Sequence, residues 1–260
     1  MGGWLVRFSS GLTRRANSVL PWGEPTEAAG FDAAVTEVEH RSAERWLAPT
    51  FQLWSALQDP SGAEQGPDDV PHPPLIGHHA ALEEFLTRRG YRAVADTDVL
   101  WLDARDLPED PEWDRRIIVN ENPDEAWLAA VHRGLGRDLD PATGLTLRRL
   151  LGGVRSRFYR IQGPGGEVVA ISKMSIVPDP RPESSAVYGG LYSLWVHPEH
   201  RRQGLARRLL HATFHQTRQL GLDGLWLQVE TSAVEGRSLY LKEGFRPAAS
   251  YRYLSTITSA

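Results

Sequence analysis

The 260-residue chain contains no cysteine. Disulfides, thiolate metal sites and a cysteine nucleophile are therefore excluded. The sequence also lacks an apolar run of the roughly 20 residues that a membrane-spanning helix needs. Its first residues, MGGWLVRFSSG, contain neither a basic segment followed by an apolar one nor a small-residue cleavage site. We therefore expect a soluble, cytoplasmic protein with no membrane partner.

An excess of positive charge is absent as well, since 29 Lys and Arg stand against 33 Asp and Glu, for a net charge of -4. A general nucleic-acid binder needs an extended basic surface, so we expect no nucleic-acid partner. The histidines in PHPPLIGHH and HPEH offer neither an i, i+4 helical pair nor a cysteine beside them. We therefore expect no metal site.

Three turn-rich segments, at 59–74, 106–114 and 178–185, predict loops. We expect the middle one to separate two domains, 1–112 and 113–260. Periodicity and turn residues predict the following elements in the first domain: two short strands within VRFSSGLTRRANSVL, a helix over 27–46, a strand over 49–54, a helix ending at Gly90 and a strand from Tyr91.

The second domain begins with helices predicted over 124–135 and 142–151. Three successive strands follow, RFYRIQ, EVVAISKMSIV and GGLYSLWVH, the first two joined by the hairpin turn GPGG. The pattern then predicts a helix capped by Gly221, the strand LWLQVE, a helix with a Ser232–Glu235 capping box that ends at Gly244, and final strands.

The two halves contain a faint repeat. LTRRGYR in the first half resembles LKEGFR in the second, and aligning Gln52 with Gln228 also aligns Leu20 with Val196 without a gap. The halves are therefore interpreted as related.

An arginine-rich segment, VHPEHRRQGLARRLL (196–210), lies between a predicted strand and a predicted helix. Such a turn presents unpaired N–H groups and the positive end of a helix dipole, which attract an anion. Gly204 permits close backbone approach, Ala206 keeps the first helical turn thin, and arginines add donors suited to phosphate oxygens. A diphosphate would satisfy this arrangement. The alternative is a solvated helix face formed by the arginines, namely Arg201, Arg202, Arg207 and Arg208.

The surroundings favour the anion site, because R-x-x-G-x-A at 201–206 follows an apolar strand and precedes a strand, a helix with Tyr240, and Gly244-Phe245. This ordered set, over roughly 117–255, resembles the GNAT acetyltransferases. LWVHPEHRRQGLARRLL is similar to that superfamily's acetyl-CoA pyrophosphate loop, and SLYLKEGF to its helix with a tyrosine near the leaving thiol. The chain departs from the family at Ala233 and Gly236, where Asn and Ala are frequent.

The resemblance implies an α/β (α+β) fold of two GNAT-like domains, each a twisted mixed central sheet flanked by helices. Acetyl-CoA would be the cosubstrate, with its diphosphate on the amides of 202–207 and its pantetheine arm between the strands ending at Val196 and Glu230. An N–H at about Val196 would polarise the thioester carbonyl. The implied contacts are Leu194, Trp195, Val196, Arg201, Arg202, Gln203, Gly204, Leu205, Ala206 and Arg207.

The implied reaction is direct attack of a neutral primary amine on the thioester, without a covalent enzyme intermediate. Tyr240 is the candidate acid for the departing thiolate, and Glu230 the candidate base for the amine. His197 is another candidate base, while Tyr192 stands where the family often has an acid. The acceptor remains open among metabolite, antibiotic, peptide terminus and protein lysine, and the assembly is expected to be a monomer or a homodimer.

The first half lacks the chemistry of the second. Across the repeat, Pro25 takes the place of Arg201, Ala28 of Gly204, Leu86 of Tyr240 and Trp54 of Glu230. We therefore expect a degenerate copy that binds no acetyl-CoA and packs on the active copy, with TRRANS (13–18) as a solvated edge or an acceptor contact. Two other functions stay open, a non-catalytic acyl-CoA-binding sensor and nucleic-acid binding through the arginines.

Overall fold

The computed structural model describes residues 3–55, 76–109, 111, 113–136 and 141–256. The chain folds into two compact units. Unit 1 comprises Met1–Leu100, Val229–Arg237 and Pro247–Ala260, and unit 2 comprises Trp101–Gln228 and Ser238–Arg246. The chain therefore passes from one unit to the other four times. The segments do not follow a cut after residue 112, and the division into two related domains stays a prediction.

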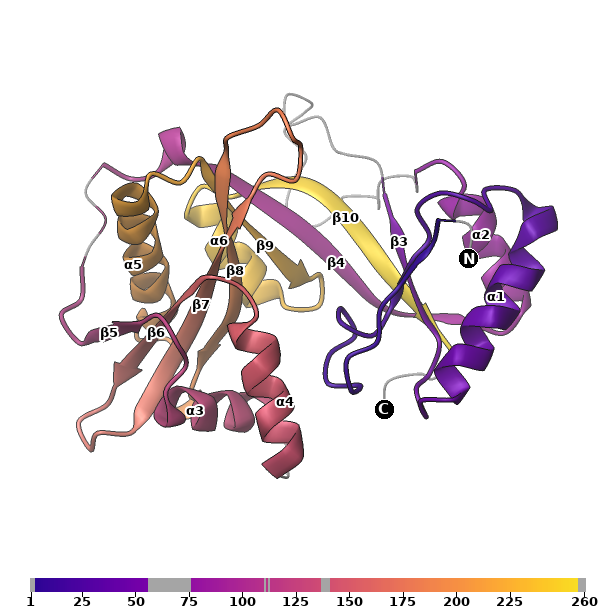
Figure 1. Cartoon of the computed structure of the whole chain (residues 1–260). Coiled ribbons are helices and arrows are strands. Elements are labelled where there is room, and N and C mark those ends of the chain that lie inside the picture. The colour runs from indigo at the N-terminus through magenta and orange to yellow at the C-terminus, as the bar shows by residue number, and fades with distance from the viewer. Residues whose placement is uncertain (1–2, 56–75, 110, 112, 137–140, 257–260) are drawn as a thin grey trace. The chain divides into compact units, whose positions relative to one another are not determined.

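Unit 1 is a mixed sheet with two helices (Figure 1). Its elements are β1 (Leu5–Val6), β2 (Val19–Leu20), α1 (Ala28–Ala43), β3 (Thr50–Trp54), α2 (His79–Arg88), most of β4 (Arg92–Asp103) and most of β10 (Arg246–Ser255). Strand β2 lies antiparallel to β1 and parallel to β3, and β3 pairs antiparallel with β10. The predicted helices and strands of the first half are confirmed. The whole of the predicted loop at 59–74 lies outside the described residues.

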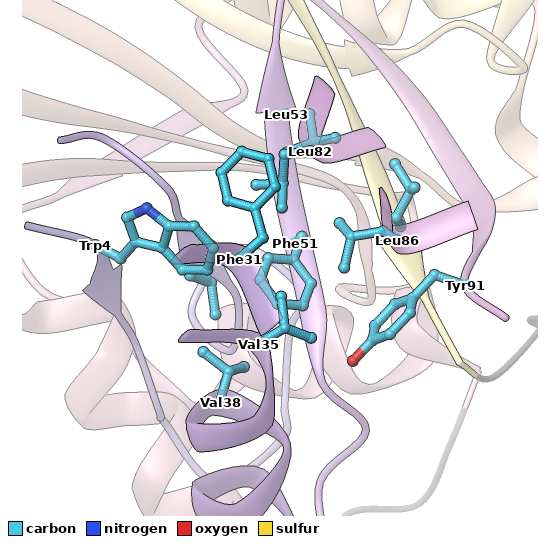
Figure 2. Packing of buried hydrophobic residues seen from close by; sticks show 11 residues of the cluster. Trp4, Phe31, Val35, Val38, Phe51, Leu53, Leu82, Leu86 and Tyr91 are labelled. Carbon is cyan, nitrogen blue, oxygen red and sulfur yellow. The ribbon is translucent and has the colours of Figure 1, made fainter. Parts of the chain in front are cut away.

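The core of unit 1 forms because α1 places apolar residues on one face at helical spacing (Figure 2). Phe31, Val35 and Val38 are fully buried, and they meet Phe51 and Leu53 of β3. Burying each such side chain contributes about 1.5–3 kcal/mol. Leu254 of β10 belongs to the same cluster, so the last strand of the chain completes the core of the first 100 residues.

Unit 2 is also a mixed sheet with helices. Its elements are η1 (Ala104–Asp106), β5 (Ile117–Asn120), α3 (Glu125–Leu135), α4 (Pro141–Gly152), β6 (Ser156–Gln162), β7 (Val168–Pro178), β8 (Val187–Val196), η2 (Pro198–His200), α5 (Leu205–Leu220), most of β9 (Gly224–Glu230) and the end of α6 (Val234–Lys242). Strands β5 to β8 pair antiparallel in sequence order, and β9 lies parallel to β8. The predicted helices and strands are confirmed, while β5 was not predicted. The predicted final strands are one strand, β10, which pairs with β3.

Helices α3 and α5 cover opposite faces of the strands of unit 2 (Figure 1). The side chain of Met174 on β7 contacts Thr217 of α5. Its neighbour Lys173 lies opposite Phe158 of β6, whose ring packs on Trp127 of α3. Consecutive residues of a strand point to opposite faces, so Lys173 lies on the α3 face.

The two segments of the predicted repeat end their helices in the same way. A glycine with positive φ follows each, Gly90 (+97°) after α2 and Gly244 (+92°) after α6. In both, the N–H of the next, buried aromatic residue bonds to the carbonyl five residues back: Tyr91 to Leu86 at 3.0 Å, and Phe245 to Tyr240 at 3.1 Å. The likeness of LTRRGYR to LKEGFR is therefore a shared helix termination.

In the described part of the chain, no helix is long and apolar enough to cross a membrane.

Candidate functional site

The arginine-rich segment forms a tight turn between β8 and α5. After η2 the backbone takes positive φ at Arg202 (+61°) and at Gly204 (+76°), and α5 begins at Leu205. A Cβ on Gly204 would meet no atom within 4 Å. Glycine is therefore favoured here by its backbone conformation, and the space beside it is open to a ligand.

The start of α5 provides donors for an anion. The first hydrogen bond of the helix runs from the N–H of Arg208 to the carbonyl of Gly204 at 3.0 Å. The N–H groups of Leu205, Ala206 and Arg207 precede it, and by helix geometry they have no acceptor within the helix. Three amides and the positive end of a helix of 16 residues thus meet at the open turn, an arrangement that fits a phosphate group.

Two of the arginine side chains are ion-paired with buried carboxylates. Arg207 donates to Glu243 at 2.7 Å, and Glu243 also contacts His211 at 2.9 Å. Arg208 donates to Asp114 at 2.7 Å. Both carboxylate side chains are only 7% exposed. The alternative of a purely solvated arginine face is wrong for these two, because they tie α5 to other parts of unit 2.

Asp114 is held in its charged form. It accepts hydrogen bonds from Arg116 as well as from Arg208, and these bonds lower the pKa of Asp114 far below its usual range. Arg201, by contrast, turns back toward β8, where its Nε donates to the carbonyl of Val196 at 3.4 Å.

Strand β8 contains a bulge just before the turn. Ile171 pairs with Trp195 while Lys173 pairs with Tyr192, so β8 has one extra residue, and Ser193 adopts a φ of +54°. The parallel pairing of β8 with β9 ends at Leu191 and Leu227, although β8 continues to Val196. The two parallel strands are therefore paired only as far as Leu191 and Leu227.

The N–H of Val196 points away from β7. The next residue, His197, donates its N–H to the carbonyl of Val169 at 2.8 Å. Successive N–H groups along a strand point to opposite edges, so the N–H of Val196 faces the edge where β8 has no partner. The side chain of Trp195 packs against α3. Its ring lies beside Gly134, and the guanidinium of Arg133 lies 5.9 Å from the ring centroid.

Tyr240 lies in the unit 2 part of α6. Its ring packs on Phe245 with centroids 5.9 Å apart, and burial raises the pKa of Tyr240 to about 12. The phenol therefore keeps its proton at neutral pH, as a proton donor must.

Glu230 groups with unit 1, where its carboxylate accepts a hydrogen bond from Arg14 at 2.9 Å. Both side chains are well exposed, at 51% and 40%. His197 accepts the N–H of Glu199 at 3.4 Å and thereby caps η2. That contact favours a structural role for His197, and the base role of Glu230 stays a prediction.

Lys173 was missed by the sequence reasoning. It is 6% exposed, and its Nζ lies 5.7 Å from the ring centroid of Phe158 and 5.5 Å from that of Tyr192. The sequence did single out this residue by composition, because Lys173 and Lys242 are the only lysines beside 27 arginines.

A second feature of unit 2 is a cleft of about 390 Å³ between α3 and α4. Leu128 and Leu145 provide apolar walls, and Glu125 and Arg148 form an ion pair at its edge. Among the described residues, no group of three or more His, Cys, Asp and Glu is arranged to hold a metal ion.

The chain is similar to known proteins in sequence and in fold. The family model described as Acetyltransferase (GNAT) family matches residues 153–245. Among curated proteins, none matches. In fold, the chain is similar to a GCN5-related N-acetyltransferase from Sphaerobacter thermophilus, with a TM-score of 0.61, 17% identity, and 94% of this chain and 74% of that chain covered.

Two further solved structures have similar folds. A GCN5-related N-acetyltransferase from Kribbella flavida has a TM-score of 0.58 and 16% identity, covering 92% of this chain and 81% of that one. A tandem GNAT protein from the clavulanic acid biosynthesis pathway has a TM-score of 0.58 and 14% identity, covering 94% and 76%. At these identities the likeness is one of fold.

Proposed function

This chain is a member of the GNAT acetyltransferase superfamily through residues 153–245, and from that membership we propose that it transfers the acetyl group of acetyl-CoA to a primary amine. The observation that carries the proposal is the open turn at Gly204, where the first amides of α5 converge. A family match alone would leave the activity general, as acyl transfer. The turn supports a phosphate-bearing donor such as CoA.

In the proposed complex, the amides of 202–207 hold the diphosphate of acetyl-CoA, and Leu194 and Val196 contact its pantetheine arm. Two observations support this placement. The pairing of β8 with β9 stops at Leu191, which leaves strand edge for the arm, and the N–H of Val196 faces that edge. An N–H there stabilises charge that develops on the thioester oxygen.

The proposed chemistry forms an N–C bond between the amine and the acetyl carbon while the C–S bond breaks. Tyr240 donates its phenolic proton to the departing thiolate. Burial of this phenol raises its pKa, so the phenol is protonated at neutral pH and has a proton to donate.

In the proposed function, the β2–α1 turn of unit 1 is not an anion site. The position of its β2–α1 turn that corresponds to Gly204 is Ala28, the first residue of α1, and Glu27 is the N-cap of that helix. A carboxylate at the N-terminus of α1 would repel phosphate. We therefore assign donor binding to unit 2.

Calorimetry with CoA and acetyl-CoA, followed by thiol release with a panel of primary amines, tests the proposal. Binding of both ligands with turnover of at least one amine supports an enzyme. Binding without turnover of any amine supports a non-catalytic acyl-CoA-binding sensor. If neither ligand binds, both the enzyme and the sensor are excluded. Nucleic-acid binding predicts instead a salt-dependent affinity that CoA does not compete.

A further inference from the structure

The buried amine of Lys173 has no function in the mechanism above. It projects from the middle of β7 on the α3 face, in register with Phe158 on one side and Tyr192 on the other. Within the described part of the chain it forms no ion pair, and its Nζ lies over two aromatic rings. Lysine is almost never buried without a partner, because removing the ammonium from water is costly.

The charged groups that flank Lys173 on this face are engaged with other partners. From β6, Arg160 pairs with Asp124 at the start of α3, at 2.9 Å. From α3, Arg133 donates to the carbonyl of Val168 at 3.1 Å. A further titratable neighbour is the phenol of Tyr192 on β8. Burial alone lowers the pKa of Lys173, to about 8, so a substantial fraction of this amine is neutral in slightly alkaline solution.

Lys173 lies next to the proposed transfer site. Its cross-strand partner Tyr192 directly precedes the bulge at Ser193, and the residues proposed to contact the thioester arm begin at Leu194. Directly opposed side chains on neighbouring strands have Cβ atoms about 5 Å apart. Helix α3 lies on the face of these strands that carries Lys173, and α5 lies on the other face. The acceptor amine is placed on the Lys173 face, at the end of β8 that β9 leaves unpaired.

A buried amine can serve as a fixed positive charge or as a proton acceptor, and the composition of the chain favours the second role. A fixed positive charge for an anionic substrate is supplied equally well by arginine, which this chain uses 27 times against two lysines. Lysine differs in that it can lose its proton. We infer that Lys173, in its neutral form, is the general base that accepts the proton of the attacking amine.

This inference rests on the proposed function and replaces Glu230 as the proton acceptor. In the balanced step, the amine nitrogen bonds to the acetyl carbon and the C–S bond breaks. The proton of the amine moves to Nζ of Lys173, and the thiolate takes the proton of Tyr240. Before the next turnover, Lys173 returns its proton to solvent and Tyr240 regains one from solvent.

The first test uses the full chain without any substrate. With ¹³C-labelled lysine the protein gives two side-chain Cε signals, and the Lys242→Arg variant assigns them. We expect the Lys173 signal to titrate near pH 8, with exposed Lys242 as the internal reference. A Lys173 signal that stays protonated beyond pH 10 overturns the inference.

The second test measures thiol release by Lys173→Met and Lys173→Arg, with Lys242→Arg as the control. Both Lys173 variants should lose about 100-fold in kcat and the rise of kcat/KM toward pH 8, while calorimetry gives a CoA Kd within about threefold of wild type. Activity retained by Lys173→Arg would assign a charge role and overturn the base role, as would full activity of Lys173→Met. A wild-type protein that acetylates no amine contradicts the proposed function itself, so the two failures are distinguishable.

Discussion

Single residues of the site differ in how far the sequence could predict them. Gly204 and Tyr240 were found because their spacing is part of an ordered motif. The ion pairs of Arg207 and Arg208 could not be predicted, because Glu243 and Asp114 are 36 and 94 positions away in the chain. Only tertiary packing brings such groups within hydrogen-bond distance.

Replacement of Tyr240 by phenylalanine removes the proposed proton donor but keeps the ring that packs on Phe245. We expect kcat for thiol release to fall about 100-fold with little change in the free energy of unfolding. Tyr188→Phe, which removes a phenol that contacts Asp179 at 3.4 Å near the start of β8, is the matched control and should retain full activity. Equal activity of Tyr240→Phe and wild type would remove Tyr240 from the mechanism.

The buried Lys173 predicts a pH-dependent stability. Its pKa is about 8 in the folded chain and near the ordinary 10.4 in the unfolded chain, so between these values the unfolded state binds more protons. Stability therefore rises with pH across this window, by about 2 kcal/mol from pH 7 to pH 10. Urea unfolding at both pH values should show this gain in wild type relative to Lys173→Met. Identical pH dependence of the two proteins would contradict a depressed pKa.

At the scale of elements, periodicity predicted the helices well, since apolar spacing and terminal glycines mark both their faces and their ends. The short strand β5 was missed because four residues, IIVN, are too few to show alternation. The bulge at Ser193 was also beyond prediction, because serine has no preference for positive φ and the register with β7 imposes it.

The glycines at the two ends of α5 are a matched pair of positions for testing the anion site. Gly204 and Gly221 both have positive φ, +76° and +62°, and a Cβ on either would meet no atom within 4 Å. Alanine at either position should destabilise the protein by about 1 kcal/mol. Only Gly204→Ala should also weaken CoA binding, by about tenfold or more, as measured by calorimetry. Equal CoA affinities of the two variants would argue against the turn as the diphosphate site.

At the scale of the whole molecule, sequence order was misleading. The last strand follows the proposed catalytic elements in the chain, yet β10 pairs with β3 over five residues and contributes Leu254 to the core of unit 1. Order along the chain predicts which elements are consecutive, but a strand pairs with any edge that its residues complement.

Residues 113–260 expressed alone should therefore be unstable. This fragment keeps β10 but removes β3 and the helices whose side chains cover Leu254. We expect an aggregation-prone product without a cooperative thermal transition, whereas the full chain gives one. A soluble fragment with full thiol-release activity would show that the first 112 residues are dispensable.

The pairing of β3 with β10 also determines when unit 1 can finish folding during synthesis at the ribosome. The partner strand for residues 50–54 emerges from the exit tunnel only after 246–255 have been translated, some 200 residues later. Until then, the amino-terminal core has an open edge and lacks Leu254. The strand at 50–54 thus gains its partner only when 246–255 are made, and chains whose translation stops before residue 246 are natural targets for chaperones and proteases.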